Sequence, residues 1–110
     1  MGASIFETAT IFSFDEYIEY AKGSIVSKKV MSTKVGSISL FAFDKGEELS
    51  EHSAPFDALL QLLDGNAKVK IDGRDYRLAK DQSIILPANV PHSLKADEAF
   101  KMLLTILRNE

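Results

Sequence analysis

Two short stretches decide how this chain of 110 residues folds: residues 46–58 read GEELSEHSAPFDA and continue to Gly65, and residues 87–92 read PANVPH. Each stretch holds one histidine, His52 in the first and His92 in the second, and the chain has only these two. Glycine and proline in the first stretch, and proline and asparagine in the second, indicate tight turns. If the chain closes into a small barrel, the two imidazoles meet inside it although forty positions separate them in the sequence.

The composition is that of one globular domain, which we expect to span residues 1–110. The chain is 45% hydrophobic and 26% charged, with a net charge of −3, and no basic cluster exceeds Lys28-Lys29, so a nucleic-acid partner is not expected. The absence of cysteine excludes disulfides and thiolate chemistry. No apolar run approaches the ~20 residues of a membrane span, and the N-terminus lacks the pattern of a signal peptide. We therefore expect a cytoplasmic protein without a membrane partner.

One helix is predicted, close to the N-terminus. Ser13 and Glu16 have the spacing of a capping box, and apolar residues follow at helical spacing. Gly23 is typical of the end of a helix. The sequence therefore predicts a short α-helix over residues 13–22. Because so short a helix is unstable alone, we expect it to dock on the rest of the domain.

From Ser24 onward the sequence changes to a β pattern. Apolar residues alternate with polar ones or form short runs, and turn residues separate the runs. Asp72-Gly73 is typical of a two-residue hairpin. The expected strands cover residues 25–31, 35–43, 58–63, 67–71, 75–78, 83–86, 92–95 and 100–107. This pattern predicts an all-β sandwich or barrel.

The spacing of these residues resembles the cupin superfamily, whose fold is a jelly-roll β-barrel, also called a double-stranded β-helix. The first cupin motif runs Gly, five residues, His, one residue, His, three or four residues, Glu, six residues, Gly. Gly46, His52 and Gly65 match it in register. The second motif runs Gly, five residues, Pro, one residue, Gly, two residues, His, three residues, Asn, and Pro87 and His92 match it. The resemblance covers residues 35–107 and implies a cupin-type barrel over them, to which the predicted N-terminal helix is added.

The remaining motif positions differ from the family pattern. In the first motif, Ala54 stands at the second His position and Ala58 at the Glu position. In the second motif, Asp81 and Asn89 stand at the two Gly positions and Ala96 at the Asn position. Asparagine is the usual replacement for glycine where a turn needs a positive φ, so Asn89 is predicted to keep the geometry of this turn.

These differences bear directly on metal binding. In cupins that bind metal, the resemblance implies two His and one Glu from the first motif and one His from the second, and only His52 and His92 stand at such positions. Metal sites usually need at least three protein ligands. Strand parity directs Glu51, Ser53 and Asp57 away from the face of His52, unless a bulge turns Asp57 inward. The prediction is no metal, or a weakly held divalent transition metal on His52 and His92.

The same differences predict an apolar site inside the barrel. On the parity of Ala58, the next even-numbered residues also point inward. The candidate ligand-binding residues are His52, Ala54, Ala58, Leu60, Leu62 and His92. A cavity of this composition fits a small apolar or aromatic molecule. The alternative is that the leucines and their apolar neighbours Val69, Ile84 and Leu86 simply fill the barrel.

Three kinds of function follow from these residues, and no catalytic residue is assigned. The first is binding of a small apolar or aromatic molecule. The second is a metal-dependent enzyme, similar to a dioxygenase or isomerase, that uses His52 and His92. The third is a dimeric interaction or regulatory module. Residues 35–43 and 100–107 are apolar on both faces, which favours a homodimer, and the family resemblance implies one as well.

Overall fold

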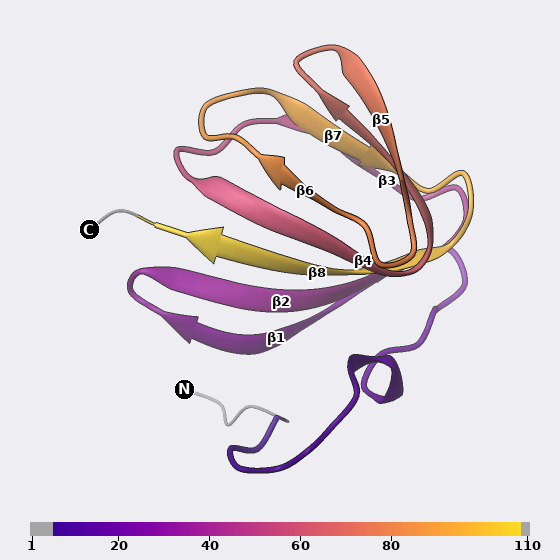
Figure 1. The fold of residues 1–110 in the computed structure, drawn as a ribbon. Helices are drawn as coiled ribbons and strands as arrows, with labels where there is room; N and C mark the ends of the chain where they lie inside the picture. The colour runs from indigo at the N-terminus through magenta and orange to yellow at the C-terminus, as the bar shows by residue number, and fades with distance from the viewer. Residues whose placement is uncertain (1–5, 109–110) are drawn as a thin grey trace.

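The structure is a computed structural model that describes residues 6–108, and it is almost entirely β (Figure 1). Its strands within these residues are β1 (Ile25–Thr33), β2 (Gly36–Phe43), β3 (Glu48–His52), β4 (Asp57–Ile71), β5 (Arg74–Ala79), β6 (Ser83–Leu86), β7 (His92–Lys95) and β8 (Phe100–Leu107). The all-β prediction is confirmed. Residues 1–5 and 109–110, which the predicted domain of residues 1–110 includes, lie outside the described part.

The strands form two layers that share β4. Sheet A has the order β1-β2-β8-β4-β6, and sheet B has the order β5-β4-β7-β3, with every neighbouring pair antiparallel. β4 passes from one sheet to the other near Gly65, whose φ is +79°. A Cβ at this position would lie 2.0 Å from the carbonyl oxygen of Ala99, so only glycine fits. This close approach explains the last glycine of the first motif.

Two features of the strand prediction differ from the structure. Residues 58–63 and 67–71, expected as two strands, belong to the single strand β4, because the ladder with β8 continues through Gly65. β3 was not expected as a strand, since all five of its residues are exposed and show no alternation of apolar and polar side chains. Its pairing with β7 makes it a strand.

The turn predictions are confirmed by the backbone angles. Asp72 and Gly73 have φ values of +51° and +79°, the left-handed conformation that a two-residue hairpin requires. They join Ile71 to Arg74, which pair directly. Asn89 has a φ of +63°, so it adopts the conformation expected of a glycine replacement.

The α-helix predicted over residues 13–22 is wrong. Only a 3-10 helix, η1 (Phe14–Glu16), forms among these residues, and the side chain of Ser13 makes no capping hydrogen bond. An extended path lets apolar side chains from several positions reach sheet A, whereas a helix presents only one face. Ile18 is 1% exposed as a result. No helix within residues 6–108 is long and apolar enough to cross a membrane.

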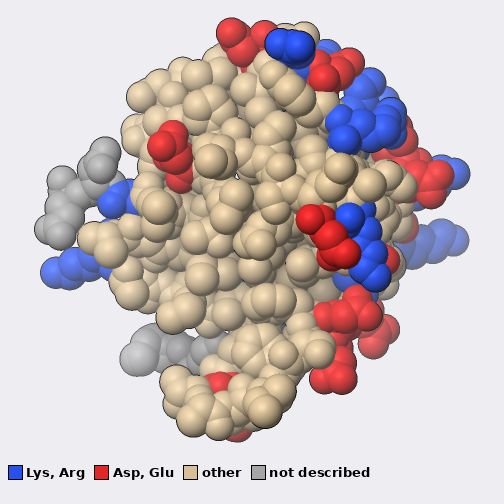
Figure 2. Space-filling view, viewed as in Figure 1, with Lys and Arg blue, Asp and Glu red and all other residues tan. Residues whose placement is uncertain are grey.

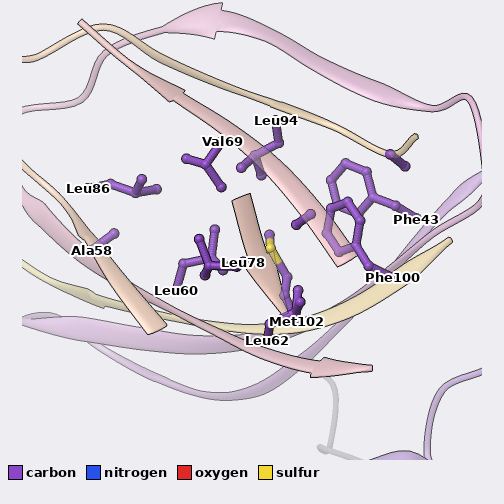
Figure 3. Packing of buried hydrophobic residues seen from close by; sticks show 12 residues of the cluster. Phe43, Ala58, Leu60, Leu62, Val69, Leu78, Leu86, Leu94, Phe100 and Met102 are labelled. Atoms are coloured by element: carbon purple, nitrogen blue, oxygen red, sulfur yellow. The ribbon is translucent and has the colours of Figure 1, made fainter. Parts of the chain in front are cut away.

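Two apolar clusters stabilise the fold. The first lies between the two sheets and contains Phe43, Ala58, Leu60, Leu62, Ala67, Val69, Leu78, Leu86, Leu94, Ala96, Phe100 and Met102 (Figure 3). The second lies on the outer face of sheet A, under the N-terminal segment (residues 6–24), and contains Phe6, Ile18, Leu40, Ala42 and Leu103. The chain thus buries apolar side chains on both sides of sheet A.

Candidate functional site

The structure brings the two histidines into direct contact. His52 of β3 and His92 of β7 are paired in register. Their ring centroids lie 4.4 Å apart, with the ring planes inclined by 65°. His92 is also paired with Ile71 of β4 on its other side. The pairing of β3 with β7 therefore brings together two histidines that lie forty positions apart in the sequence. They meet at one end of sheet B.

A β-bulge in β3 directs His52 toward the interior. Leu49 lies opposite Leu94, and His52 lies opposite His92. Leu94 and His92 are two positions apart, so they share one face of β7. Leu49 and His52 are three positions apart and would lie on opposite faces of a regular strand. The register shift between them adds one residue and returns His52 to the face of His92.

Two loops meet at the end of the barrel where His52 and His92 lie, and we call this the loop end. They are residues 53–56, between β3 and β4, and residues 87–91, between β6 and β7. The backbone N–H of Asn89 donates a hydrogen bond of 2.7 Å to the carbonyl oxygen of Ala54. The left-handed conformation of Asn89 thus helps hold together the loops that precede Ala58 and His92. Ala54 is half-buried, and Ala58 is 8% exposed.

Hydrogen bonds to the backbone determine which ring nitrogen carries the proton. Nδ1 of His52 lies 2.9 Å from the carbonyl oxygen of Ser50, and Nδ1 of His92 lies 3.2 Å from that of Val90. A carbonyl oxygen only accepts, so Nδ1–H donates in both rings. In the neutral ring, Nε2 is then an acceptor. The pair therefore offers two acceptor nitrogens to a ligand or to water.

Burial affects the protonation of one member of the pair. His92 is 7% exposed, whereas His52 is exposed. Burial lowers the pKa of His92 below its ordinary value, and the positive charge of a protonated His52 would lower it further. The hydrogen bond to the Val90 carbonyl opposes this shift. The burial effect is larger, so His92 is neutral at neutral pH.

The residues at the loop end do not fit the metal site of metal-binding cupins. Within residues 6–108, no three His, Asp or Glu side chains are grouped so that they could hold a metal ion. Asp57, the replacement ligand expected if a bulge turned it inward, is exposed, and its Oδ1 accepts a hydrogen bond of 2.8 Å from the backbone N–H of Ala88. Two imidazoles leave too much of the coordination to water. We therefore derive no chemical step through a metal.

The predicted apolar lining lies where strand parity places it. Leu60 is 0% exposed and Leu62 is 1% exposed, and both belong to the cluster between the sheets. Ala58 and Leu86 are paired in register and adjoin the two loops of the loop end. Figure 3 shows them at one end of the cluster, with the rings of Phe43 and Phe100 at the other. The leucines of β4 form packed interior, and Ala58 and Leu86 form its boundary at the loop end.

Two residues beside the imidazoles were not predicted from the sequence. Ile71 lies directly opposite His92 in the register of β4 and β7. Leu49 is 40% exposed and lies opposite Leu94, on the face of β3 to which the bulge returns His52. The sequence does show that Ile71 ends a strand, because it immediately precedes the Asp72-Gly73 turn. Its pairing with β7 depends on contacts between distant segments, which the local pattern does not contain.

Comparison with known proteins identifies the family. The profile of the cupin domain matches residues 39–106, and the chain belongs to the cupin family. A conserved protein of unknown function from Streptococcus pyogenes is 35% identical, with a TM-score of 0.91, over 96% of this chain and 92% of that one. A cupin superfamily protein from Desulfitobacterium hafniense is 26% identical, with a TM-score of 0.88, over 94% and 95% of the two chains.

A third similar structure is a longer chain. A cupin 2 conserved barrel domain protein from Leptotrichia buccalis is 41% identical, with a TM-score of 0.85, over 88% of this chain but 47% of that one. This chain thus spans about half the length of that protein. No curated protein matches the chain. The comparisons establish the family and its jelly-roll barrel, and the activity has to be argued from the site.

Proposed function

We propose that this cupin binds a small apolar or aromatic molecule at the loop end of its barrel. The observation that supports this proposal is the contact of 4.4 Å between the His52 and His92 rings beside an apolar interior. At the two positions where metal-binding cupins carry a second His and a Glu, this chain has Ala54 and Ala58. Two polar acceptors beside apolar walls are typical of a site for a small organic ligand.

The protonation of the rings narrows the class of ligand. Because Nδ1–H of each ring is bonded to the backbone, the neutral pair offers Nε2 acceptors. A ligand that carries a hydroxyl or N–H donor can satisfy them, and its apolar part would lie toward Ala58 and Leu86. A phenol combines these properties in one small molecule. A hydrocarbon of the same shape leaves the acceptors without a partner, which costs binding free energy.

The test is calorimetric titration of chelator-treated protein with simple phenols and with hydrocarbons of matched size. We expect the phenols to bind about fivefold more tightly, since one hydrogen bond contributes about 1 kcal/mol. His92→Phe and His52→Ala should each remove this preference. Lys70→Ala, on the exposed side of sheet B, serves as the matched control and should bind like the wild type. Absence of binding, or a preference that survives both histidine variants, would refute the proposal.

A metal-dependent reaction similar to a dioxygenase or isomerase is the competing hypothesis, and the same protein tests it. If the site works without metal, protein purified without chelator contains less than one equivalent of any transition metal. His52→Ala then leaves that content unchanged. A full equivalent that is lost in His52→Ala, together with ligand binding that requires the metal, would favour the enzyme instead.

A further inference from the structure

At the loop end, the sheet A side of the barrel carries an arginine that lies on an aromatic ring. The guanidinium carbon of Arg108 is 5.4 Å from the centre of the Phe56 ring. Phe56 immediately precedes β4 and Arg108 immediately follows β8, and the outermost pair of these two strands is Asp57 with Leu107. The contact between Phe56 and Arg108 therefore extends the neighbourhood of β4 and β8 one position beyond their ladder.

Strand parity places both side chains on the inner face of sheet A. Ala58 and Ile106 are paired, and both contact the cluster between the sheets. Side chains two positions apart share one face of a strand, so Phe56 and Arg108 face the same way as this pair. Their burial agrees, since both are half-buried whereas the pair between them and the cluster is exposed. Phe56 and Arg108 thus form a rim next to the apolar boundary at Ala58.

Backbone contacts fix this rim at the end of the barrel that holds the histidines. The backbone N–H of Arg108 donates a hydrogen bond of 2.7 Å to the carbonyl oxygen of Val35, which holds the arginine against the start of β2. Phe56 ends the loop between β3 and β4, which a hydrogen bond ties to the loop between β6 and β7. Figure 1 shows the C-terminal end of β8 on the same side of the molecule as both loops. The arginine and the two imidazoles therefore lie at one end of the barrel, on opposite sheets.

The positive charge of Arg108 has no carboxylate partner within residues 6–108, where the ion pairs join other residues. Asp57, the acid next to Phe56 in the sequence, points to the opposite face and accepts a hydrogen bond from the backbone N–H of Ala88. A guanidinium that lies on an aromatic ring uses its flat face for this contact, so its N–H donors stay free for an anion. Arg108 thus offers a charge and hydrogen-bond donors at the rim of an apolar interior.

We propose that Arg108 binds a carboxylate group of the ligand and makes the site selective for aromatic acids that also carry a hydroxyl group. This ligand class rests on the proposed function, in which the hydroxyl donates to Nε2 of His52 or His92 on sheet B. The apolar ring then lies against Ala58 and Leu86, and the carboxylate reaches Arg108 on sheet A. A guanidinium binds a carboxylate through two parallel hydrogen bonds, which a neutral phenol cannot form. A hydroxyaryl carboxylate therefore uses the polar groups on both sides of the loop end.

The surroundings of the rim favour an anion although the chain has a net charge of −3. Arg108 is half-buried, and a charge that is partly removed from water interacts more strongly with an opposite charge. Figure 2 shows that the surface over β6 and β8 is largely uncharged in that view, while charged side chains gather beside β5. A carboxylate at the rim also keeps water on its outer side, so binding there does not bury the full charge in the apolar interior.

A second arginine has a similar local contact and provides the matched control. The guanidinium carbon of Arg74 is 5.7 Å from the centre of the Tyr76 ring, and Arg74 also forms no ion pair within residues 6–108. Arg74 lies on sheet B, opposite Ile71 of β4, and is exposed. Because water and salt screen an exposed charge more strongly, we expect Arg108 and not Arg74 to select the carboxylate.

The test is calorimetric titration of the full chain, treated with chelator, with 4-hydroxybenzoate and with 4-methylphenol, in which a methyl group replaces the carboxylate. At low salt we expect 4-hydroxybenzoate to bind at least about tenfold more tightly, since hydrogen bonds to charged groups are stronger than neutral ones. Arg108→Gln should remove this preference, and Arg108→Lys, which keeps the charge without the two parallel hydrogen bonds, should retain part of it. Arg74→Gln should retain all of it.

Spectra of the wild type provide a second measurement that needs no variant. The ring resonances of Phe56 should shift more with 4-hydroxybenzoate than with 4-methylphenol, while the methyl resonances of the buried Leu78 stay constant. If 4-methylphenol binds and 4-hydroxybenzoate binds no more tightly, the role of Arg108 is refuted and the phenol site stands. A preference that survives Arg108→Gln, or that Arg74→Gln removes, refutes it equally. If neither compound binds, the proposed function fails together with the role of Arg108.

Discussion

The outer faces of the two sheets differ sharply. The outer face of sheet B is charged and lies in water, with Lys68 and Lys70 of β4 beside Asp75 of β5. The outer face of sheet A is apolar, and the N-terminal segment buries Leu40 and Leu103 there. Both sheets supply apolar side chains to the interior between them. Their outer faces differ because only that of sheet A is apolar, and the N-terminal segment covers part of it.

The polar contacts differ between the two faces in the same way. On sheet A, the hydroxyl of Tyr20 donates a hydrogen bond of 2.6 Å to Oδ2 of Asp64, and Nζ of Lys101 lies 2.9 Å from Oδ1 of Asp15. Burial and the bond to Asp64 raise the pKa of Tyr20 well above its ordinary value, so the phenol stays protonated. On sheet B, Nζ of Lys68 and Oδ2 of Asp75 are 3.9 Å apart, and their side chains are 36% and 54% exposed. Partly buried polar contacts hold the N-terminal segment against sheet A, whereas the ion pair on sheet B is more open to solvent.

The largest effect should come from the apolar contact of the N-terminal segment. Ile18→Ala removes a fully buried side chain from the cluster on sheet A and should lower the free energy of unfolding by about 2–5 kcal/mol. Lys70→Ala on sheet B should change it by less than about 0.5 kcal/mol. Urea denaturation measures both. Equal effects would mean that the segment is not part of the stable fold and that the two faces do not differ in this respect.

A smaller effect should come from the polar contact of the same segment. Tyr20→Phe keeps the ring and removes the bond to Asp64, so we expect a loss of about 1–2 kcal/mol in the free energy of unfolding. Asp75→Asn, which removes the exposed pair with Lys68 on sheet B, should cost less than about 0.5 kcal/mol. The same urea titrations compare them. If Asp75→Asn lowers the free energy of unfolding as much as Tyr20→Phe does, the greater burial of the contact on sheet A does not make it more stabilising.

The smallest effect concerns the inner side of sheet B, where a titrating group is buried. The pKa of His92 is lowered in the folded chain, so the unfolded chain, with a pKa of about 6.5, takes up the proton first. The free energy of unfolding should therefore fall as the pH drops from about 6.5 toward the lowered folded pKa, and His92 should contribute no pH dependence above that window.

His92→Phe provides the comparison for this pH dependence. The variant should lose less stability than the wild type over the same pH range, as thermal unfolding at several pH values can show. Lys70→Ala, on the outer side of the same sheet, should follow the wild type. An identical pH profile for His92→Phe would show that burial of this imidazole does not affect stability.

The sequence predicts the turns well because turn conformation depends on residue type. Asp72-Gly73 and Asn89 adopt the positive φ values that their side chains allow. The inward direction of Leu60 and Leu62 also follows from parity alone, since both are buried in the core. The contact between the histidines is a different case. The sequence predicts this contact only if the chain closes into a barrel, and the closed barrel is implied by the resemblance to the cupin family.

The failures have a common physical cause. Apolar residues near the N-terminus have helical spacing, but the apolar outer face of sheet A provides a better partner for an extended segment, and only η1 forms. β3 shows no alternation because every residue in it is exposed, and its bulge depends on pairing with β7. Both features depend on contacts between distant segments, which no local pattern records.

The passage of β4 through both sheets has a consequence for how the chain folds and unfolds. β4 pairs with β8 and β6 in sheet A and with β5 and β7 in sheet B. Neither layer can open completely while β4 keeps its place in the other, so the domain should unfold in one cooperative transition. Amide protons in the middle of β4 should then exchange with solvent only through global unfolding. Because most of these pairings join distant parts of the chain, folding should be slow for a domain of this length.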